Sequence, residues 1–133
     1  MVKMPKEVVE MFGDWGAQKA VATADAEGRL NVVPVLTFSV LDEETLAFGD
    51  VFLGKTRANL EATKKVAVAA WKGSKGYQVK GSFLGFQTAG AVFEEKKAAV
   101  KEKLKLEAKS VGLIKVEEVF SVSVGPNAGK RLV

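Results

Sequence analysis

The sequence contains no cysteine and no histidine among its 133 residues, and only one tyrosine, two tryptophans and three prolines. Without cysteine the chain has no disulfide, thiolate nucleophile, iron–sulfur cluster or cysteine zinc site. Without histidine it lacks the usual general base near neutral pH, the imidazole of catalytic triads and the commonest metal ligand. If the protein carries out chemistry, we therefore expect a bound cofactor to supply most of it.

Long apolar runs are also missing, because none reaches the roughly 18 residues that a bilayer-spanning helix needs. Residues 1–13 include charged side chains and lack the apolar core of a secretory signal, so we expect a cytoplasmic protein with no membrane partner. The length and the globular composition, with 47% hydrophobic residues, predict a single domain over residues 1–133. A net charge of +4 from scattered lysines suits a small anionic ligand better than a nucleic acid.

Hydrophobic periodicity and turn residues predict six strands, one long helix and two short helices. The strands are expected over residues 20–24, 30–40, 45–48, 66–71, 77–92 and 116–124, and the helices over residues 5–12, 55–63 and 94–110. Short connections between the strands favour a mainly β, α+β fold, in which an antiparallel sheet closes into a small barrel with flanking helices. Pro34 lies inside the second predicted strand and has no N–H, which predicts a sheet edge, a bulge or a kink that faces a ligand.

Residues 49–56, Gly-Asp-Val-Phe-Leu-Gly-Lys-Thr, match the phosphate-binding P-loop pattern letter for letter. The bulky residues 51–53 suit that loop poorly, and the rest of the chain predicts neither a parallel sheet nor an acidic residue to hold magnesium. A P-loop nucleotide-binding protein is therefore a minor alternative. The turn at Gly54 still leads into a helix whose first amides, with Lys55 and Thr56, could hold one phosphate. The alternative interpretation is that Thr56 only caps the helix and Lys55 is solvated.

Several segments together resemble the pyridoxamine 5′-phosphate oxidase-like, FMN-binding split-barrel family. Residues 21–23, Gly28 and residues 31–35 are similar to its opening hairpin, and residues 55–60, Lys-Thr-Arg-Ala-Asn-Leu, followed by 66–68, are similar to its central segment. Residues 79–82 resemble a later strand of the family. The resemblance covers about residues 15–125. It implies a six-stranded antiparallel Greek-key split β-barrel that forms a homodimer with an FMN in each of two clefts at the interface.

The resemblance also implies which residues bind FMN. Lys55 and Thr56 would hold the phosphate together with the loop amides that precede them, including that of Gly54. Val33, Pro34 and Val35 would run beside the phosphate, the ribityl chain and the ring. The stretch from Phe48 to Leu53 would line the isoalloxazine ring, with candidate contacts at Phe48, Gly49, Asp50, Phe52 and Leu53. Asn59 would brace the loop, and Trp71 and Gln87 are candidates for the rim of the cleft.

The activity is less defined than the cofactor. Pyridoxamine 5′-phosphate oxidases use a histidine and extra arginines for their substrate, and this chain has no histidine, so the resemblance reaches the FMN site but not that substrate site. An electron carrier serving a small-molecule or protein redox partner, an NAD(P)H-dependent flavin reductase and a flavin store are open alternatives. No metal site is expected. A different class, the small oligonucleotide-binding β-barrel, needs aromatic side chains interleaved with basic ones, whereas most of the few aromatics here fall at core-like positions.

Overall fold

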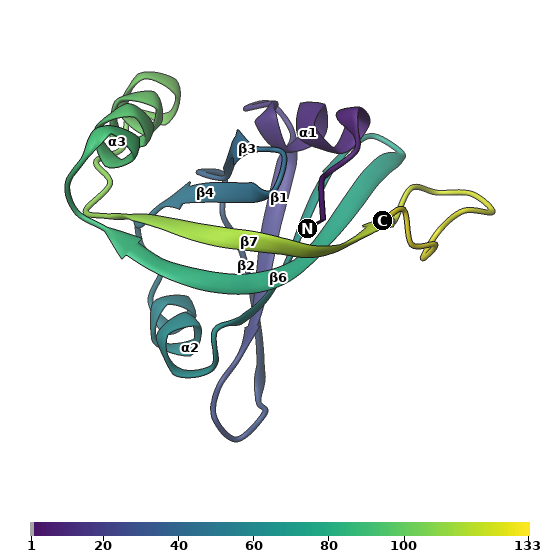
Figure 1. Ribbon diagram of the computed structural model, residues 1–133, viewed down its shortest axis with the longest axis horizontal. Coiled ribbons are helices and arrows are strands. Elements are labelled where there is room, and N and C mark those ends of the chain that lie inside the picture. Colours follow the sequence, from purple (N-terminus) through teal and green to yellow (C-terminus); the bar gives the residue numbers. More distant parts are fainter. Residues whose placement is uncertain (1) are drawn as a thin grey trace.

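One continuous antiparallel sheet organises residues 2–133, the part of the chain that this computed structural model describes (Figure 1). Along the chain the elements are α1 (Lys6–Gly13), β1 (Gln18–Ala24), β2 (Leu30–Pro34), β3 (Ser39–Asp42), β4 (Thr45–Gly49), α2 (Lys55–Thr63), β5 (Lys65–Lys72), β6 (Lys75–Gln87), α3 (Ala91–Leu104) and β7 (Val111–Ser121). The strands are ordered β2-β1-β5-β6-β7-β4-β3 across the sheet. This mixed α+β architecture agrees with the predicted class.

The expectation of six strands in a closed barrel was wrong: the described chain has seven strands, and the sheet is open. The predicted strand 30–40 divides at Pro34 into β2 and β3, which form the two opposite edges of the sheet. Proline ends the pairing because it cannot donate a ladder hydrogen bond. The expectation of a sheet edge at Pro34 is therefore confirmed.

Residues 35–38 cross the opening between these two edges and are fixed at both ends. The Val35 N–H donates to the Lys19 carbonyl of β1 (3.1 Å), and the Thr37 hydroxyl donates to the Gly49 carbonyl at the end of β4 (3.0 Å). The side chains of Val35, Thr37 and Phe38 are buried. The opening of the barrel is thus spanned by a well-packed segment rather than by paired strands.

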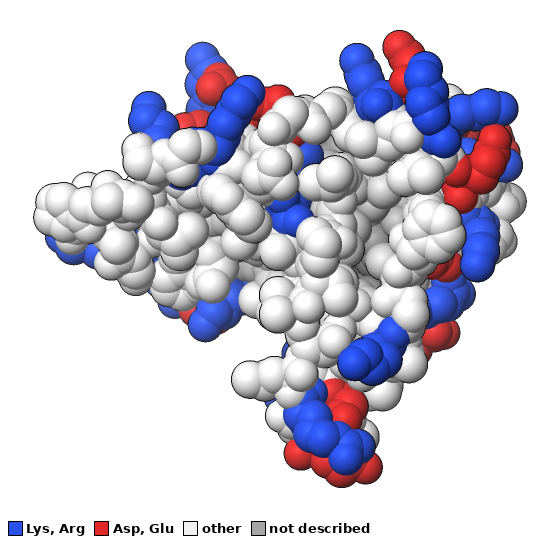
Figure 2. Space-filling model, turned by 180° about the vertical axis from the view of Figure 1, so that it is seen from behind, with Lys and Arg blue, Asp and Glu red and all other residues white. Residues whose placement is uncertain are grey.

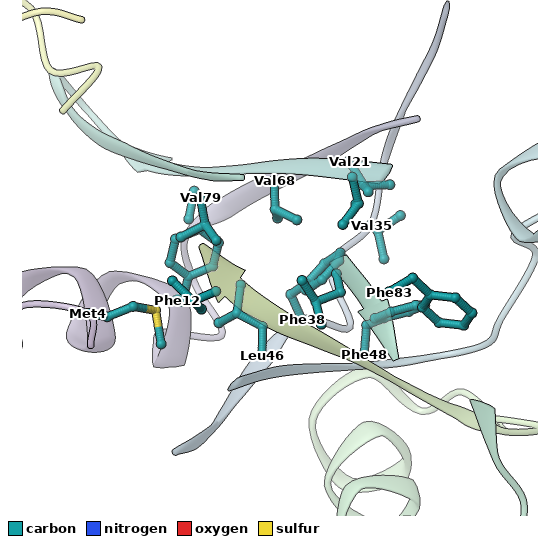
Figure 3. Close-up of a cluster of buried hydrophobic side chains, with 14 of the residues drawn as sticks. Met4, Phe12, Val21, Val35, Phe38, Leu46, Phe48, Val68, Val79 and Phe83 are labelled. Carbon is teal, nitrogen blue, oxygen red and sulfur yellow. The ribbon is translucent and has the colours of Figure 1, made fainter. Parts of the chain in front are cut away.

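The hydrophobic core lies on the inner face of the curved sheet. Alternate residues of β1 and β5, such as Val21 and Val68, point inward, as the two-residue repeat of a strand requires. They meet Val79 of β6 and a group of aromatic rings that pack in tilted and edge-to-face arrangements (Figure 3). The Phe38 and Phe48 ring centroids lie 4.9 Å apart.

Two glycines allow strands to pass where no side chain would fit. A Cβ at Gly112 of β7 would lie 2.3 Å from the Phe48 ring, and a Cβ at Gly81 of β6 would lie 2.1 Å from the Lys115 carbonyl oxygen. The register of β6 against β7 shifts at Gly81 and again before Gly85. Glycines in this long strand therefore mark bulges and a close approach between two backbones.

The predicted helix 94–110 is too long at its C-terminal end. The helix α3 stops at Leu104, where Lys105 adopts a left-handed conformation (φ 59°), and residues 105–110 form a loop. Ala108 and Val111 continue the apolar spacing of the helix, but they are buried from the loop and from β7 instead. The last strand accordingly spans Val111–Ser121 rather than 116–124.

The helices and the C-terminal residues flank the sheet (Figure 1). The C-terminal residues fold back on β7, with the Ser121 N–H donating to the Lys130 carbonyl (2.9 Å) and the Leu132 N–H donating to the Val119 carbonyl (2.7 Å). Between residues 2 and 133 the longest apolar helix falls short of what is needed to cross a membrane.

Candidate functional site

The loop between β4 and α2 has an unusual backbone, as the P-loop-like sequence suggests. Phe52 and Gly54 both adopt positive φ angles, 55° and 56°. Glycine takes up such a conformation freely, but for phenylalanine it costs about 1–2 kcal/mol. The Phe52 side chain is also 91% exposed. A strained backbone and an exposed aromatic ring at one position are typical of a functional loop.

Helix α2 begins directly after this loop, over the predicted residues 55–63. Its N-cap residue is Gly54, and no side chain caps the helix. Thr56 is therefore not the cap: its buried hydroxyl accepts a hydrogen bond from the Asn31 amide of β2 (3.2 Å). The Lys55 side chain is exposed and forms no ion pair among residues 2–133. The start of α2 therefore presents a cation and a hydroxyl beside an amide of β2.

Asn59 anchors the same face of α2 one turn after Thr56. Its side-chain amide donates to the Thr23 hydroxyl of β1 (3.0 Å), and Thr63 donates to the Ala24 carbonyl (3.0 Å). Asn59 is 8% exposed. These bonds hold α2 against the hairpin of β1 and β2, a position from which Asn59 braces the helix.

A pocket of about 340 Å³ lies where residues 35–38 cross the opening of the barrel. We call it the proline pocket. It is lined by Val33, Pro34, Val35, Leu36, Thr37, Val51, Phe52, Leu104 and Leu106. All of these except Thr37 are apolar. The predicted segment 33–35 and Phe52 therefore share one apolar pocket.

A second pocket of about 540 Å³, which we call the arginine pocket, lies on the other side of Phe52. It is lined by Asp50, Phe52, Leu53, Gly54, Arg57, Thr88, Lys109 and Ser110. Its lining carries two cationic side chains and one carboxylate. Phe52 is the residue that borders both pockets.

Arg57 is held firmly at the arginine pocket. Its guanidinium pairs with the buried carboxylate of Asp50 and lies 3.9 Å from the centroid of the Phe86 ring. Ser110 donates its hydroxyl to Asp50 (3.1 Å), and the Asp50 N–H donates to the Ser110 carbonyl (2.8 Å). The loop after β4 and the loop before β7 are thereby joined. Arg57 is oriented by these contacts, since ion pairing and ring stacking both restrict a guanidinium.

The remaining predicted residues lie apart from these pockets. Phe48 is 2% exposed and packs in the aromatic core, and Gly49 is buried beneath Thr37. Trp71 pairs with Gln18 and Gly76 at the other end of β5 from α2. Gln87 ends β6 next to Thr88, which lines the arginine pocket. Lys55 lines neither pocket and is linked to β2 through the bond between Thr56 and Asn31.

Sequence reasoning missed Lys19, a lysine with 1% exposure. Its ammonium donates to the Phe38 carbonyl (3.0 Å) and lies 5.5 Å from the centroid of the Trp15 ring. Burial lowers the pKa of Lys19 from 10.5 to about 8, and the Asp14 carboxylate opposes this shift. The sequence does contain a signal for the burial of Lys19, because Lys19 lies two residues before Val21 and therefore on the same inward side of β1. Leu104 and Leu106 were also missed, because residues 105–110 were expected to be helical.

Comparison with known proteins places this geometry among related folds. No family model matches the sequence. The uncharacterized protein MJ0282 of Methanocaldococcus jannaschii is 31% identical over an alignment of 143 positions, gaps included, and the alignment covers 99% of this chain and 89% of that protein. The crystal structure of HupZ from Group A Streptococcus superimposes with a TM-score of 0.79 and 30% identity, covering 97% of this chain and 100% of the other.

More distant structures share the fold. An FMN-binding protein from Syntrophomonas wolfei has a TM-score of 0.78 at 17% identity, covering 90% of this chain and 89% of that one. HutZ, the heme storage protein from Vibrio cholerae, has a TM-score of 0.64 at 17% identity, covering 86% and 89%. Proteins of this fold are thus named for binding either flavin or haem.

Proposed function

The chain belongs to the pyridoxamine 5′-phosphate oxidase-like, FMN-binding split-barrel family, and from this premise we propose that it is an FMN-binding redox protein that works as a homodimer. The observation that carries the proposal is the proline pocket, whose lining residue Val33 lies two residues along β2 from Asn31, the hydrogen-bond partner of Thr56. An apolar cavity next to cationic and hydroxyl groups matches a ligand with a planar ring at one end and a phosphate at the other.

The residues of this site fit FMN. In the proposed complex Lys55 and Thr56 bind the phosphate, because Lys55 has no competing ion pair among the described residues and Thr56 can donate its hydroxyl hydrogen. The ring lies in the proline pocket, where Val33 and Pro34 belong to the edge strand β2, which pairs with β1 and with no other strand among residues 2–133. Leu104 and Leu106 exclude water from the opposite wall. Bound FMN supplies hydride or single-electron transfer, and these residues bind and orient it.

A second copy of the chain is proposed to cover the outer face of the sheet, defined here as the outward side of β2, β1 and β5. Directly paired residues lie on the same side of a sheet, so this face carries the rows Val32–Ala22–Ala67 and Pro34–Ala20–Ala69. Leu30 and Val32 are 89% and 68% exposed. Figure 2 shows a broad area with few charged side chains above the charged tip of the hairpin between β1 and β2. Apolar patches of this kind mark protein interfaces.

Haem is the second cofactor in the names of proteins with this fold, because HutZ is named as a heme storage protein. The sequence has neither histidine nor cysteine to serve as an axial ligand of haem iron. An FMN site needs neither residue, since the cofactor is bound through its phosphate and its ring. The composition of the chain therefore favours FMN over haem.

A charge-reversal pair tests the proposal. Lys55→Glu places a carboxylate at the proposed phosphate site, whereas Lys103→Glu makes the same change of charge at an exposed position of α3. We expect the FMN dissociation constant of Lys55→Glu, measured by quenching of flavin fluorescence, to rise by at least about 100-fold, because an attractive charge–phosphate contact becomes repulsive. The Lys103→Glu protein should bind FMN as the unaltered protein does. Equal affinities in the two variants would refute the phosphate site.

A further inference from the structure

With the ring of FMN placed in the proline pocket, the arginine pocket is left without a proposed ligand, although its lining includes Asp50, Leu53 and Gly54, which the family resemblance offers as FMN contacts. At about 540 Å³ it is the size of a small-molecule site. It shares the lining residue Phe52 with the proline pocket, so a ligand bound there lies next to the site proposed for the flavin ring. This inference rests on the proposed function only in taking the ligand of the proline pocket to be FMN.

Arg57 offers unused hydrogen-bond donors to this pocket. Its Nε atom pairs with Glu61 (3.3 Å), and one terminal nitrogen is taken by Asp50 and Ser110. The other terminal nitrogen has no hydrogen-bond partner among residues 2–133, although a guanidinium carries five N–H donors. The stacking of Arg57 on Phe86 fixes the plane of the group. A ligand anion would therefore meet a cation that is already oriented.

Lys109 brings a second cation from a different part of the chain. Its backbone N–H donates to the Asp50 carbonyl (3.2 Å), which places the residue at the pocket, while its side chain is exposed and forms no ion pair within the described chain. Arg57 and Lys109 contribute two positive charges to the lining and Asp50 one negative charge, and Glu61, which pairs with Arg57 from outside the lining, balances the second cation. The attraction for an anion therefore comes from Lys109, which has no ion pair within the described chain, and from the unused donors of Arg57.

We propose that the arginine pocket binds the phosphate groups of a second organic ligand, the small-molecule redox substrate of the flavin. Arg57 supplies a fixed pair of donors, and Lys109 supplies a mobile point charge at the other wall. Two cations on separate elements suit a diphosphate better than a single carboxylate, because each can meet a different charged group. The exposed Phe52 side chain borders both the arginine pocket and the proline pocket.

The test uses inorganic pyrophosphate as the probe and isothermal titration calorimetry of the FMN-loaded protein as the assay. We expect binding to weaken by about tenfold or more in Lys109→Glu and to be unchanged in the matched Lys103→Glu variant, since one charge-assisted contact accounts for about this factor. FMN affinity should be the same in both variants. Because Lys109 is exposed, its substitution leaves the fold intact, which the thermal midpoint of each variant checks.

Other results would overturn the inference. Displacement of FMN by pyrophosphate would mean that the arginine pocket is part of the flavin site. Absence of pyrophosphate binding, or equal weakening in both lysine variants, would mean that no specific phosphate site exists there. If the protein does not take up FMN at all, the same titration of the flavin-free protein still decides the question. In that case the inference survives only if Lys109→Glu weakens binding and Lys55→Glu does not.

Discussion

The buried ammonium of Lys19 should make the stability of the protein rise with pH in the alkaline range. Burial lowers the pKa of Lys19 to about 8 in the folded protein, whereas the unfolded chain keeps the ordinary value of 10.5. Between these two values the unfolded chain binds one proton more than the folded protein. The free energy of unfolding therefore increases from about pH 8 to 10.5 and is independent of this group below pH 8.

The size of the effect follows from the two pKa values. Their difference corresponds to at most about 3 kcal/mol in the free energy of unfolding. The groups around the amine are the Phe38 carbonyl, the Trp15 ring and Asp14, and Asp14 is itself paired with Lys72 (3.1 Å). Only Asp14 among these carries a negative charge, and its attraction for Lys19 is outweighed by the cost of burial.

Urea unfolding between pH 7 and pH 10, followed by tryptophan fluorescence, measures this rise. Lys19→Met removes the amine and should flatten the pH dependence, while Lys72→Met, at an exposed lysine near the same carboxylate, should keep it. The Lys19 ammonium also fixes residues 35–38 through the Phe38 carbonyl, and Lys19→Met removes this bond while keeping the backbone bond from the Val35 N–H to the Lys19 carbonyl. Lys19→Met should therefore also weaken FMN binding. The same slope of stability against pH in the unaltered protein and in Lys19→Met would refute the reasoning.

Three further substitutions test other parts of the account. Gly112→Ala should lower the free energy of unfolding by about 1–3 kcal/mol, because the new methyl group meets the Phe48 ring. The control Gly13→Ala adds a methyl group that meets no atom within 4 Å and should not destabilise the protein. Chemical denaturation measures the free energy of unfolding of both variants. Phe52→Gly should stabilise the protein by about 1 kcal/mol by relieving the positive φ, yet weaken FMN binding; loss of stability with unchanged affinity would contradict this. Val32→Lys should convert the dimer to monomers in light scattering, and a dimer that persists would place the interface elsewhere.

The parts of the fold that depend on local sequence were predictable. Helix α2 has the predicted bounds because the turn at Gly54 and the helix-forming residues after it act locally. The division of residues 30–40 into two strands depends on where residues 35–38 make contact, with Lys19 on one side and Gly49 on the other. Apolar pattern alone gives a continuous strand there. The end of α3 was missed for the same reason, since Ala108 is buried against Gly49 rather than along a helix.

The candidate site was likewise predictable only in part. The apolar stretch 33–35 and the loop with Phe52 were implied by the resemblance to the FMN-binding split-barrel family, and the structure brings them into one pocket. The joining of Asp50, Arg57 and Ser110 was not predictable, because it links residues 60 positions apart. Single-sequence reasoning gives the types of residue in a loop, but it does not show which distant loop packs on it.

A crystal structure of the protein grown with FMN tests the central claim most directly. The account predicts the phosphate of FMN within hydrogen-bonding distance of Thr56 and Lys55, with the ring against Pro34 in the proline pocket and a second copy of the chain over the outer face. A dimer in which the partner's own side chains fill the proline pocket, or FMN bound at a different part of the sheet, would contradict it.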